Sequence, residues 1–169
     1  MPERPSIAVL TGAVHFAYGA STFASWRAPF TCGVEVSKRF QSGVDSTARL
    51  LNEGGRASVR RFDTFVRIRQ QVTSSDLVTK RYRPMRAKDL TVRLKLLSCP
   101  RPDVTYPDEP DVTEVATINV DVSDSMHLPL AQRGIEVTMR FEQSQIHVTA
   151  RTTFNGQQQV VNIVWRPTW

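Results

Sequence analysis

The chain has 169 residues, enough for one domain with a substantial core, and its 40% hydrophobic and 22% charged residues are typical of a globular protein. The first residues, MPERPS, lack the basic and then apolar layout of a secretory signal, and no N-x-S/T acceptor site occurs, so we expect a cytoplasmic protein. The two cysteines, Cys32 and Cys99, form no C-x-x-C pair, which argues against a zinc site or a disulfide framework.

The net charge is +6, and the charges are segregated along the chain. Residues 60–101 hold twelve Lys and Arg against three acids, whereas residues 102–125 hold seven acids and no Lys or Arg. A basic face of this kind could attract nucleic acid or acidic peptide segments. The simpler interpretation is two solvated faces of one strand-rich domain.

Residues 5–20, PSIAVLTGAVHFAYGA, predict a helix that begins near Pro5 and Ser6. Its apolar residues lie on opposite faces, so the helix should be buried on several sides. The apolar run is too short, and too often interrupted by polar residues, to span a membrane. If nothing covers this helix, we expect self-association through its exposed surface.

Beyond the helix, the sequence predicts about eight short strands. Residues 30–36 are rich in β-forming side chains that alternate in polarity, whereas the polar, glycine-containing residues 41–58 predict a long loop. Residues 65–72 and 77–84 predict a pair of strands joined by a turn. Residues 90–97 alternate cleanly between apolar and polar side chains and predict another strand.

The second half of the chain continues the pattern. The acidic, proline-rich residues 100–111 predict a loop, and residues 115–122 and 158–165 predict strands. Residues 133–152 predict a hairpin, because two alternating apolar runs flank the polar turn EQSQ. Together these elements predict a mainly β fold, an antiparallel two-layer β-sandwich preceded by one N-terminal α-helix.

The sequence offers no arrangement of side chains for catalysis. The three histidines, His15, His127 and His147, are scattered and have no spacing that would place two of them on one metal ion. Neither cysteine has a histidine nearby in sequence, GGR at 54–56 is not a phosphate-binding loop, and the acids form no acid–base pair. We therefore predict no catalytic residue, no metal and no cofactor, and hence a binding protein and not an enzyme.

Aromatic residues are interleaved with basic ones at Phe62, Phe65 and Tyr82, a pattern that proteins binding single-stranded nucleic acid also use. Phe65, however, belongs to the alternating apolar set, so packing in the core explains it more simply. Nucleic acid is not the partner that the sequence favours.

Three segments carry a resemblance to the heat shock protein 70 chaperone family. Residues 128–150, LPLAQRGIEVTMRFEQSQIHVTA, resemble the family's Arg-Gly turn, its "IEVTF" strand and the strand after it. Residues 28–36, APFTCGVEV, are similar to the strand that opens its peptide-binding sandwich. Residues 5–19 are similar to the helix that closes its ATPase domain. Their order matches the family, and the sequence is most similar to the divergent heat shock 70 kDa protein 12 type.

The resemblance implies a division of the chain into residues 1–26, a remnant of the last helix of an ATPase domain, and residues 27–169, a lidless peptide-binding sandwich. Because most of the ATPase domain has no counterpart in this sequence, the resemblance implies that this chain neither binds nor hydrolyses ATP, which would act only in a full-length parent. We expect a truncated chaperone of stress-response type that holds hydrophobic segments of unfolded client proteins passively.

The resemblance also implies a peptide-binding pocket. It places Val92 and Leu94 on one pocket strand, Tyr82 and Met85 on the neighbouring strand and loop, and Phe62 at the mouth. A flexible methionine beside aromatic rings suits promiscuous recognition. The same five residues are equally compatible with a plain role as core or loop anchors.

An alternative is a degenerate interaction scaffold, in which bulky side chains fill the groove and the basic face binds acidic partners. Arg83, Arg86 and Lys88 lie beside the pocket positions, and they would favour peptides with acidic flanks. Salt separates the two hypotheses, because apolar binding in a groove survives added salt and binding by a basic face does not.

Overall fold

The structure is a computed structural model, and it describes residues 25–164. The helix predicted at 5–20 and the last residue of the strand predicted at 158–165 lie outside these residues. Within them the protein is mainly β, and every pair of strands is antiparallel, as the sequence predicted. The strands are β1 Ser25–Arg27, β2 Thr31–Arg39, β3 Leu51–Glu53, β4 Arg56–Val66, β5 Gln71–Thr73, β6 Leu77–Tyr82, β7 Thr91–Cys99, β8 Thr113–Asp121, β9 Ile135–Phe141, β10 Gln145–Thr152 and β11 Gln158–Val164. Three short 3-10 helices are η1 Thr47–Arg49, η2 Ser123–Ser125 and η3 Leu130–Gln132.

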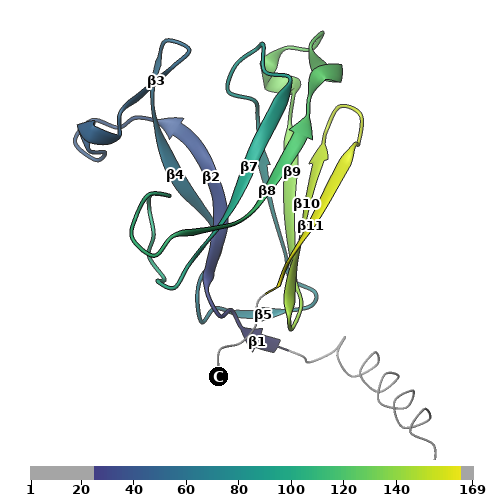
Figure 1. Ribbon diagram of the computed structural model, residues 1–169. Helices are drawn as coiled ribbons and strands as arrows, with labels where there is room; N and C mark the ends of the chain where they lie inside the picture. Colours follow the sequence, from purple (N-terminus) through teal and green to yellow (C-terminus); the bar gives the residue numbers. More distant parts are fainter. Residues whose placement is uncertain (1–24, 165–169) are drawn as a thin grey trace, which may run out of the picture.

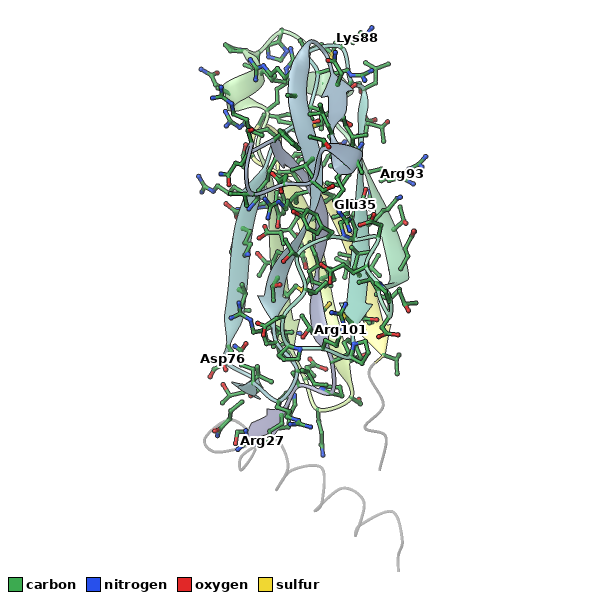
Figure 2. All side chains as sticks on the ribbon, turned by 90° about the vertical axis from the view of Figure 1, so that its left-hand side faces the viewer. Arg27, Glu35, Asp76, Lys88, Arg93 and Arg101 are labelled. Carbon is green, nitrogen blue, oxygen red and sulfur yellow. The ribbon has the colours of Figure 1, made fainter. Side chains whose placement is uncertain are left out.

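The strands form two large sheets and one small one. A five-stranded sheet has the order β3-β4-β2-β7-β8, and a four-stranded sheet has the order β11-β10-β9-β6. Figure 1 shows these two sheets facing each other, with the β1-β5 pair at one end of the molecule. We call the other end the upper end; it carries residues 83–90, 122–134 and 153–157. Lys88 lies there, and Arg27 and Asp76 lie at the opposite end (Figure 2).

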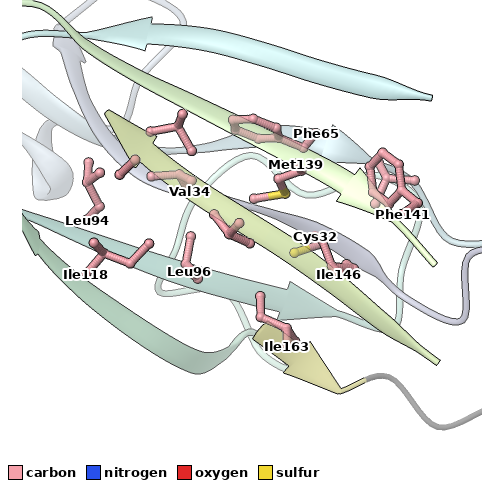
Figure 3. Packing of buried hydrophobic residues seen from close by; sticks show 14 of the residues in the cluster. Cys32, Val34, Phe65, Leu94, Leu96, Ile118, Met139, Phe141, Ile146 and Ile163 are labelled. Carbon is pink, nitrogen blue, oxygen red and sulfur yellow. The ribbon is translucent and has the colours of Figure 1, made fainter. Parts of the chain in front are cut away.

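One hydrophobic core lies between the two large sheets, and the predicted hairpin supplies much of it (Figure 3). Strand β9 pairs with β10 so that Phe141 lies opposite Ile146 and Met139 lies opposite Val148. All four side chains are buried. Because side chains alternate between the faces of a strand, this register directs every apolar residue of the hairpin into the core. Burial of each such side chain stabilises the fold by about 1.5–3 kcal/mol.

The alternation predicted for the opposing sheet is confirmed in part. Cys32 and Val34 on β2, and Leu94 and Leu96 on β7, are buried in the same core. Leu90, in contrast, is 56% exposed and precedes β7. The predicted alternation therefore extends one step too far at this end of the strand.

The loop predicted at residues 41–58 is wrong in its second half, which contains β3 and the start of β4. The two strands form a hairpin in which Glu53 pairs with Arg56 across Gly54 and Gly55. Both glycines have positive φ, 62° and 80°, as a two-residue hairpin turn of type I′ requires. The three residues of β3 are too few and too polar to show an alternating pattern.

The strand predicted at residues 65–72 is also wrong. β4 ends at Val66, a turn follows, and β5 begins only at Gln71. The predicted pairing of 65–72 with 77–84 is wrong for the same reason, because β5 pairs with β1 and β6 pairs with β9. Val66 and Val72 are both buried, and Ile68 lies midway between them, so the apolar alternation of a strand continues across the turn in the sequence and conceals it.

The acidic residues 100–112 form a loop, as predicted, and they cover a second hydrophobic cluster. That cluster consists of Phe62, Leu97 and Cys99, with Val104 and Val112 of the loop packed against them. The Phe62 amide donates a hydrogen bond of 2.8 Å to the Thr105 carbonyl. The loop thereby satisfies a backbone group at the outer edge of β4, which would otherwise be exposed to other chains.

Candidate peptide-binding site

The five-stranded sheet splits into two arms toward the upper end. β2 and β7 pair only through Thr31–Val34 and Leu96–Cys99. Above that point β2 continues paired with β4, and β7 continues paired with β8, as the diverging arms in Figure 1 show. Residues 35–39 and 91–95 thus have a strand partner on one side only within the described part of the chain. We call these two segments, and the space between them, the β2–β7 opening.

The side of the opening that faces the core is apolar. Leu94 is buried in the main core, and Val92 is half-buried and packs against it. Val36, on the β2 side, packs against the same core. Val36 was not among the predicted pocket residues, although its alternation with Cys32 and Val34 had marked it as inward-facing. Two of the five predicted residues, Val92 and Leu94, therefore lie at this opening.

Tyr82 lies at the end of β6 with its ring against the main core. Its hydroxyl donates a hydrogen bond of 2.7 Å to Asp63 Oδ2, and Lys80 Nζ donates to Asp63 Oδ1 and to the Thr64 carbonyl, both at 2.8 Å. Burial, together with the hydrogen bond and charge of Asp63, raises the pKa of Tyr82 far above its usual range. These contacts fasten β6 to β4 across the side of the two sheets.

Met85 is 44% exposed on the loop between β6 and β7. A buried arginine, Arg133, holds this loop against residues 122–134. Its guanidinium donates hydrogen bonds to the carbonyls of Ala87, Leu128 (2.9 Å) and Met126 (3.1 Å). Among the described residues its partners are carbonyl oxygens and the Met126 sulfur, and no carboxylate forms an ion pair with it.

Phe62 lies apart from the other predicted pocket residues. It is buried in the second cluster, with Leu97 and Cys99, whereas Tyr82, Val92 and Leu94 contact the main core. The structure thus brings three of the five residues to one core, leaves Met85 on the loop beside them, and places Phe62 under residues 100–112. Sequence could not show this, because a strand's alternation identifies its two faces but not what covers each face.

A network around Asp45 connects the loop after β2 with residues 100–112. Asp45 is 6% exposed; it accepts hydrogen bonds from the Gln41 amide (2.9 Å), the Tyr106 hydroxyl (2.7 Å) and Arg61. Burial opposes ionisation, but these hydrogen bonds and the charge of Arg61 together lower the pKa of Asp45. The Arg49 guanidinium lies 4.0 Å from the centre of the Tyr106 ring and adds a cation–π contact.

A hollow of about 340 Å³ lies beside this network, and Glu35, Arg49, Arg60 and Asp108 contribute to its lining. Its charges already neutralise one another, because Arg49 pairs with Asp108 and Arg60 lies 3.8 Å from Glu35. We therefore assign no ligand to this hollow.

Residues 25–164 contain neither a candidate metal site nor a membrane-spanning helix. No group of three or more His, Cys, Asp or Glu side chains in this part could hold a metal ion. Nor does this part contain a helix long and apolar enough to cross a membrane. Cys32 and Cys99 are free and buried, and burial raises the pKa of Cys32 to about 12, against a lowering hydrogen bond from Gly33. A thiol with that pKa is protonated, and hence unreactive, at neutral pH.

A strand edge without a partner strand can in general accept an extended peptide as an added strand. No family model matches the chain. Over 152 residues, 89% of the chain, it is 28% identical to the heat shock 70 kDa protein 12A of Mus musculus and to that of Homo sapiens. The matched region is 22% of the length of those relatives. The comparison confirms the resemblance to the heat shock protein 70 family and to its 12 type.

Proposed function

We propose that the chain binds an extended hydrophobic peptide segment in the β2–β7 opening, as the peptide-binding module of a protein similar to heat shock protein 70. The observation that carries the proposal is a pair of strand edges, residues 35–39 and 91–95, that face an opening beside an apolar wall and have no strand partner there within residues 25–164. In this proposal the facing sheets are the peptide-binding type of β-sandwich, and residues 27–169 form the binding domain. The similarity to heat shock 70 kDa protein 12A supports it.

The proposed recognition has two parts. Backbone groups on the free edges of β2 and β7 bind the main chain of any extended peptide, and each hydrogen bond contributes about 0.5–1.5 kcal/mol. Val36 and Val92, which are half-buried against the core that contains Leu94, supply an apolar surface that favours hydrophobic side chains. Neither part needs a cofactor or a reacting group. The proposed partners are exposed hydrophobic segments of unfolded proteins in the cytoplasm.

The first test is the affinity of a fluorescent hydrophobic heptapeptide, measured by anisotropy. We expect Val92→Phe to weaken binding by about tenfold or more, because the added ring occupies the space beside the apolar wall. Val160→Phe is the matched control, because Val160 is 53% exposed on β11, away from the opening. Circular dichroism and thermal unfolding establish that both variants fold. Equal affinity for the two variants would count against the proposed site.

The second test follows the backbone. With saturating peptide, amide hydrogen exchange should slow in residues 35–39 and 91–95, because their free N–H groups gain acceptors. The β9 strand, residues 135–141, already has partners on both sides and should not change. Protection that is confined to other strands would place the peptide elsewhere.

The alternative function is an interaction scaffold whose opening is filled by its own side chains. Two features favour this alternative. The hydrogen bond from the Tyr82 hydroxyl to Asp63 holds this bulky side chain in place, and the basic residues near Met85 offer a charged surface to acidic partners. Salt distinguishes the two, because the Debye length falls from about 10 Å at 0.1 M to about 3 Å at 1 M. Binding that persists at 1 M supports an apolar groove, whereas binding that is lost supports the scaffold.

A further inference from the structure

Exposed basic side chains flank the β2–β7 opening on both sides. They are Lys38 and Arg39 at the end of β2, Arg93 on β7, and Arg83, Arg86 and Lys88 in the loop that precedes β7. Figure 2 shows Lys88 at the upper end of the molecule and Arg93 projecting from the same half. The opening therefore combines an apolar wall with a cationic rim.

The cationic side chains of this rim have no carboxylate partner in the part of the chain that the structure describes. Within residues 25–164, none of the six forms an ion pair with a carboxylate. Elsewhere on the sheets basic residues are paired, as in Arg60–Glu53 at 2.6 Å and Arg151–Glu136 at 2.9 Å.

Two acids at the same end of the sheet are occupied by backbone groups. Asp89 accepts a hydrogen bond of 2.9 Å from the Arg86 amide, and Asp121 accepts one of 2.8 Å from the Ser123 amide. Hydrogen bonds from Ser123 hold the pKa of Asp121 below its usual range. Both carboxylates stay close to their own backbone and form no ion pair with the rim. Their negative charges offset part of the charge of the rim, but its six cations outnumber them, so a net positive charge remains where the ends of a bound peptide would leave the opening.

We propose that the opening selects hydrophobic segments flanked by acidic residues; this inference rests on the proposed function. Cations lie on the β2 side and on the β7 side of the opening. Carboxylates at either end of a bound peptide would therefore lie near several of them, within one Debye length of about 10 Å at 0.1 M salt. Flanking lysines would be repelled by the same charges. The apolar wall between the cationic sides favours a peptide over a purely anionic ligand.

The test uses three labelled peptides with one apolar core and with serine, glutamate or lysine flanks. At low salt we expect the glutamate-flanked peptide to bind about tenfold or more tighter than the lysine-flanked one, with the serine-flanked peptide in between. At about 1 M salt the three affinities should converge.

The variant Arg86→Glu/Lys88→Glu changes two exposed residues of the loop before β7, outside the two strand segments proposed to bind the peptide. It should abolish or reverse this preference and leave the affinity for the serine-flanked peptide unchanged. The matched control is Arg27→Glu/Arg67→Glu, which makes the same change in net charge at the opposite end of the molecule. If this control variant lost the preference for glutamate flanks to the same extent, the preference would follow from the net charge of the protein, and the inference would be overturned.

The remaining outcomes separate the inference from the function on which it rests. Equal affinities for the three peptides, with binding still sensitive to Val92→Phe, would overturn the inference and leave the proposed function in place. A glutamate peptide without the apolar core that bound as tightly as the one with it would overturn both.

Discussion

At the scale of single residues, the clearest structural role belongs to Asp45. It is almost buried, and its hydrogen bonds to Gln41, Tyr106 and Arg61 join two long loops on the β2–β4 arm. Nothing in the sequence around GVDST marks this aspartate, because Arg61 and Tyr106 lie far away along the chain. Its partners nevertheless lower the pKa of its carboxyl group, so the contribution of Asp45 to stability depends on pH and can be measured.

We expect Asp45→Asn to lower the free energy of unfolding near pH 7, by an amount that shrinks as the pH falls to about 3. The pKa of folded Asp45 lies below its unfolded value of about 3.9, so its carboxylate stabilises the fold above that pH. That stabilisation is lost as the pH falls through the folded pKa. Urea unfolding at several pH values measures the difference. Asp103→Asn, at an exposed position in the acidic loop, is the control and should change little.

A destabilisation by Asp45→Asn that is the same at every pH would contradict this account. It would mean that the shape of the side chain matters and its ionisation does not.

At the scale of elements, Arg133 connects two segments of the upper end. Its donors reach the loop before β7 through Ala87, and the η2–η3 segment through Met126 and Leu128. In the sequence, the pair Arg133-Gly134 is only part of the resemblance to the heat shock protein 70 family, and no structural role follows from it. The structure shows a physical use for the arginine, since a buried guanidinium needs several acceptors and here carbonyls provide them.

We expect Arg133→Met to destabilise the protein by about 1–3 kcal/mol, because buried carbonyls lose their donors. Amide exchange should accelerate more in residues 83–90 and 122–134 than in β10. Arg151→Met, which removes an exposed partner of Glu136, is the control and should cost less than about 1 kcal/mol. Unchanged exchange in residues 83–90 would show that Arg133 does not hold the loop.

Strand pairing is the part of the fold for which the sequence was least informative. The sequence predicts the β9–β10 hairpin and its buried face, because its two arms are adjacent and alternate without interruption, and the structure adds the register. β5 and β6 are also adjacent, yet they lie in different sheets. A turn between two apolar runs is a local signal, whereas a strand's partner is determined by contacts with distant residues.

At the scale of the whole molecule, the two cysteines report on global stability. Cys32 lies in the main core and Cys99 in the second cluster, and both are buried. They belong to β2 and β7, which pair below the opening. Exposure of Cys32 therefore requires opening of the core between the two large sheets, whereas exposure of Cys99 requires displacement of residues 100–112, which cover its cluster.

We expect both buried thiols to react slowly with a thiol reagent in the folded protein, and we expect the rate for Cys32 to rise with urea in parallel with global unfolding. Raising the pH to about 9 should accelerate labelling of the unfolded chain, whose thiols have a pKa of about 8.5, much more than labelling of folded Cys32. The basis is the raised pKa of Cys32, about 12. Rapid labelling of Cys32 without urea would mean that the core between the two large sheets opens in the native state.

The sequence by itself determined the mainly β class, the antiparallel hairpin and the inward positions of β2 and β7, because a period of two residues is a local property of the chain. It also carried the resemblance that the comparison with heat shock 70 kDa protein 12A confirms. Only the tertiary structure decided that β6 pairs with β9, that β2 and β7 separate, and that Phe62 lies under the acidic loop. The reason is physical: alternation determines which side of a strand is apolar, but strands and loops distant in sequence determine what that side contacts.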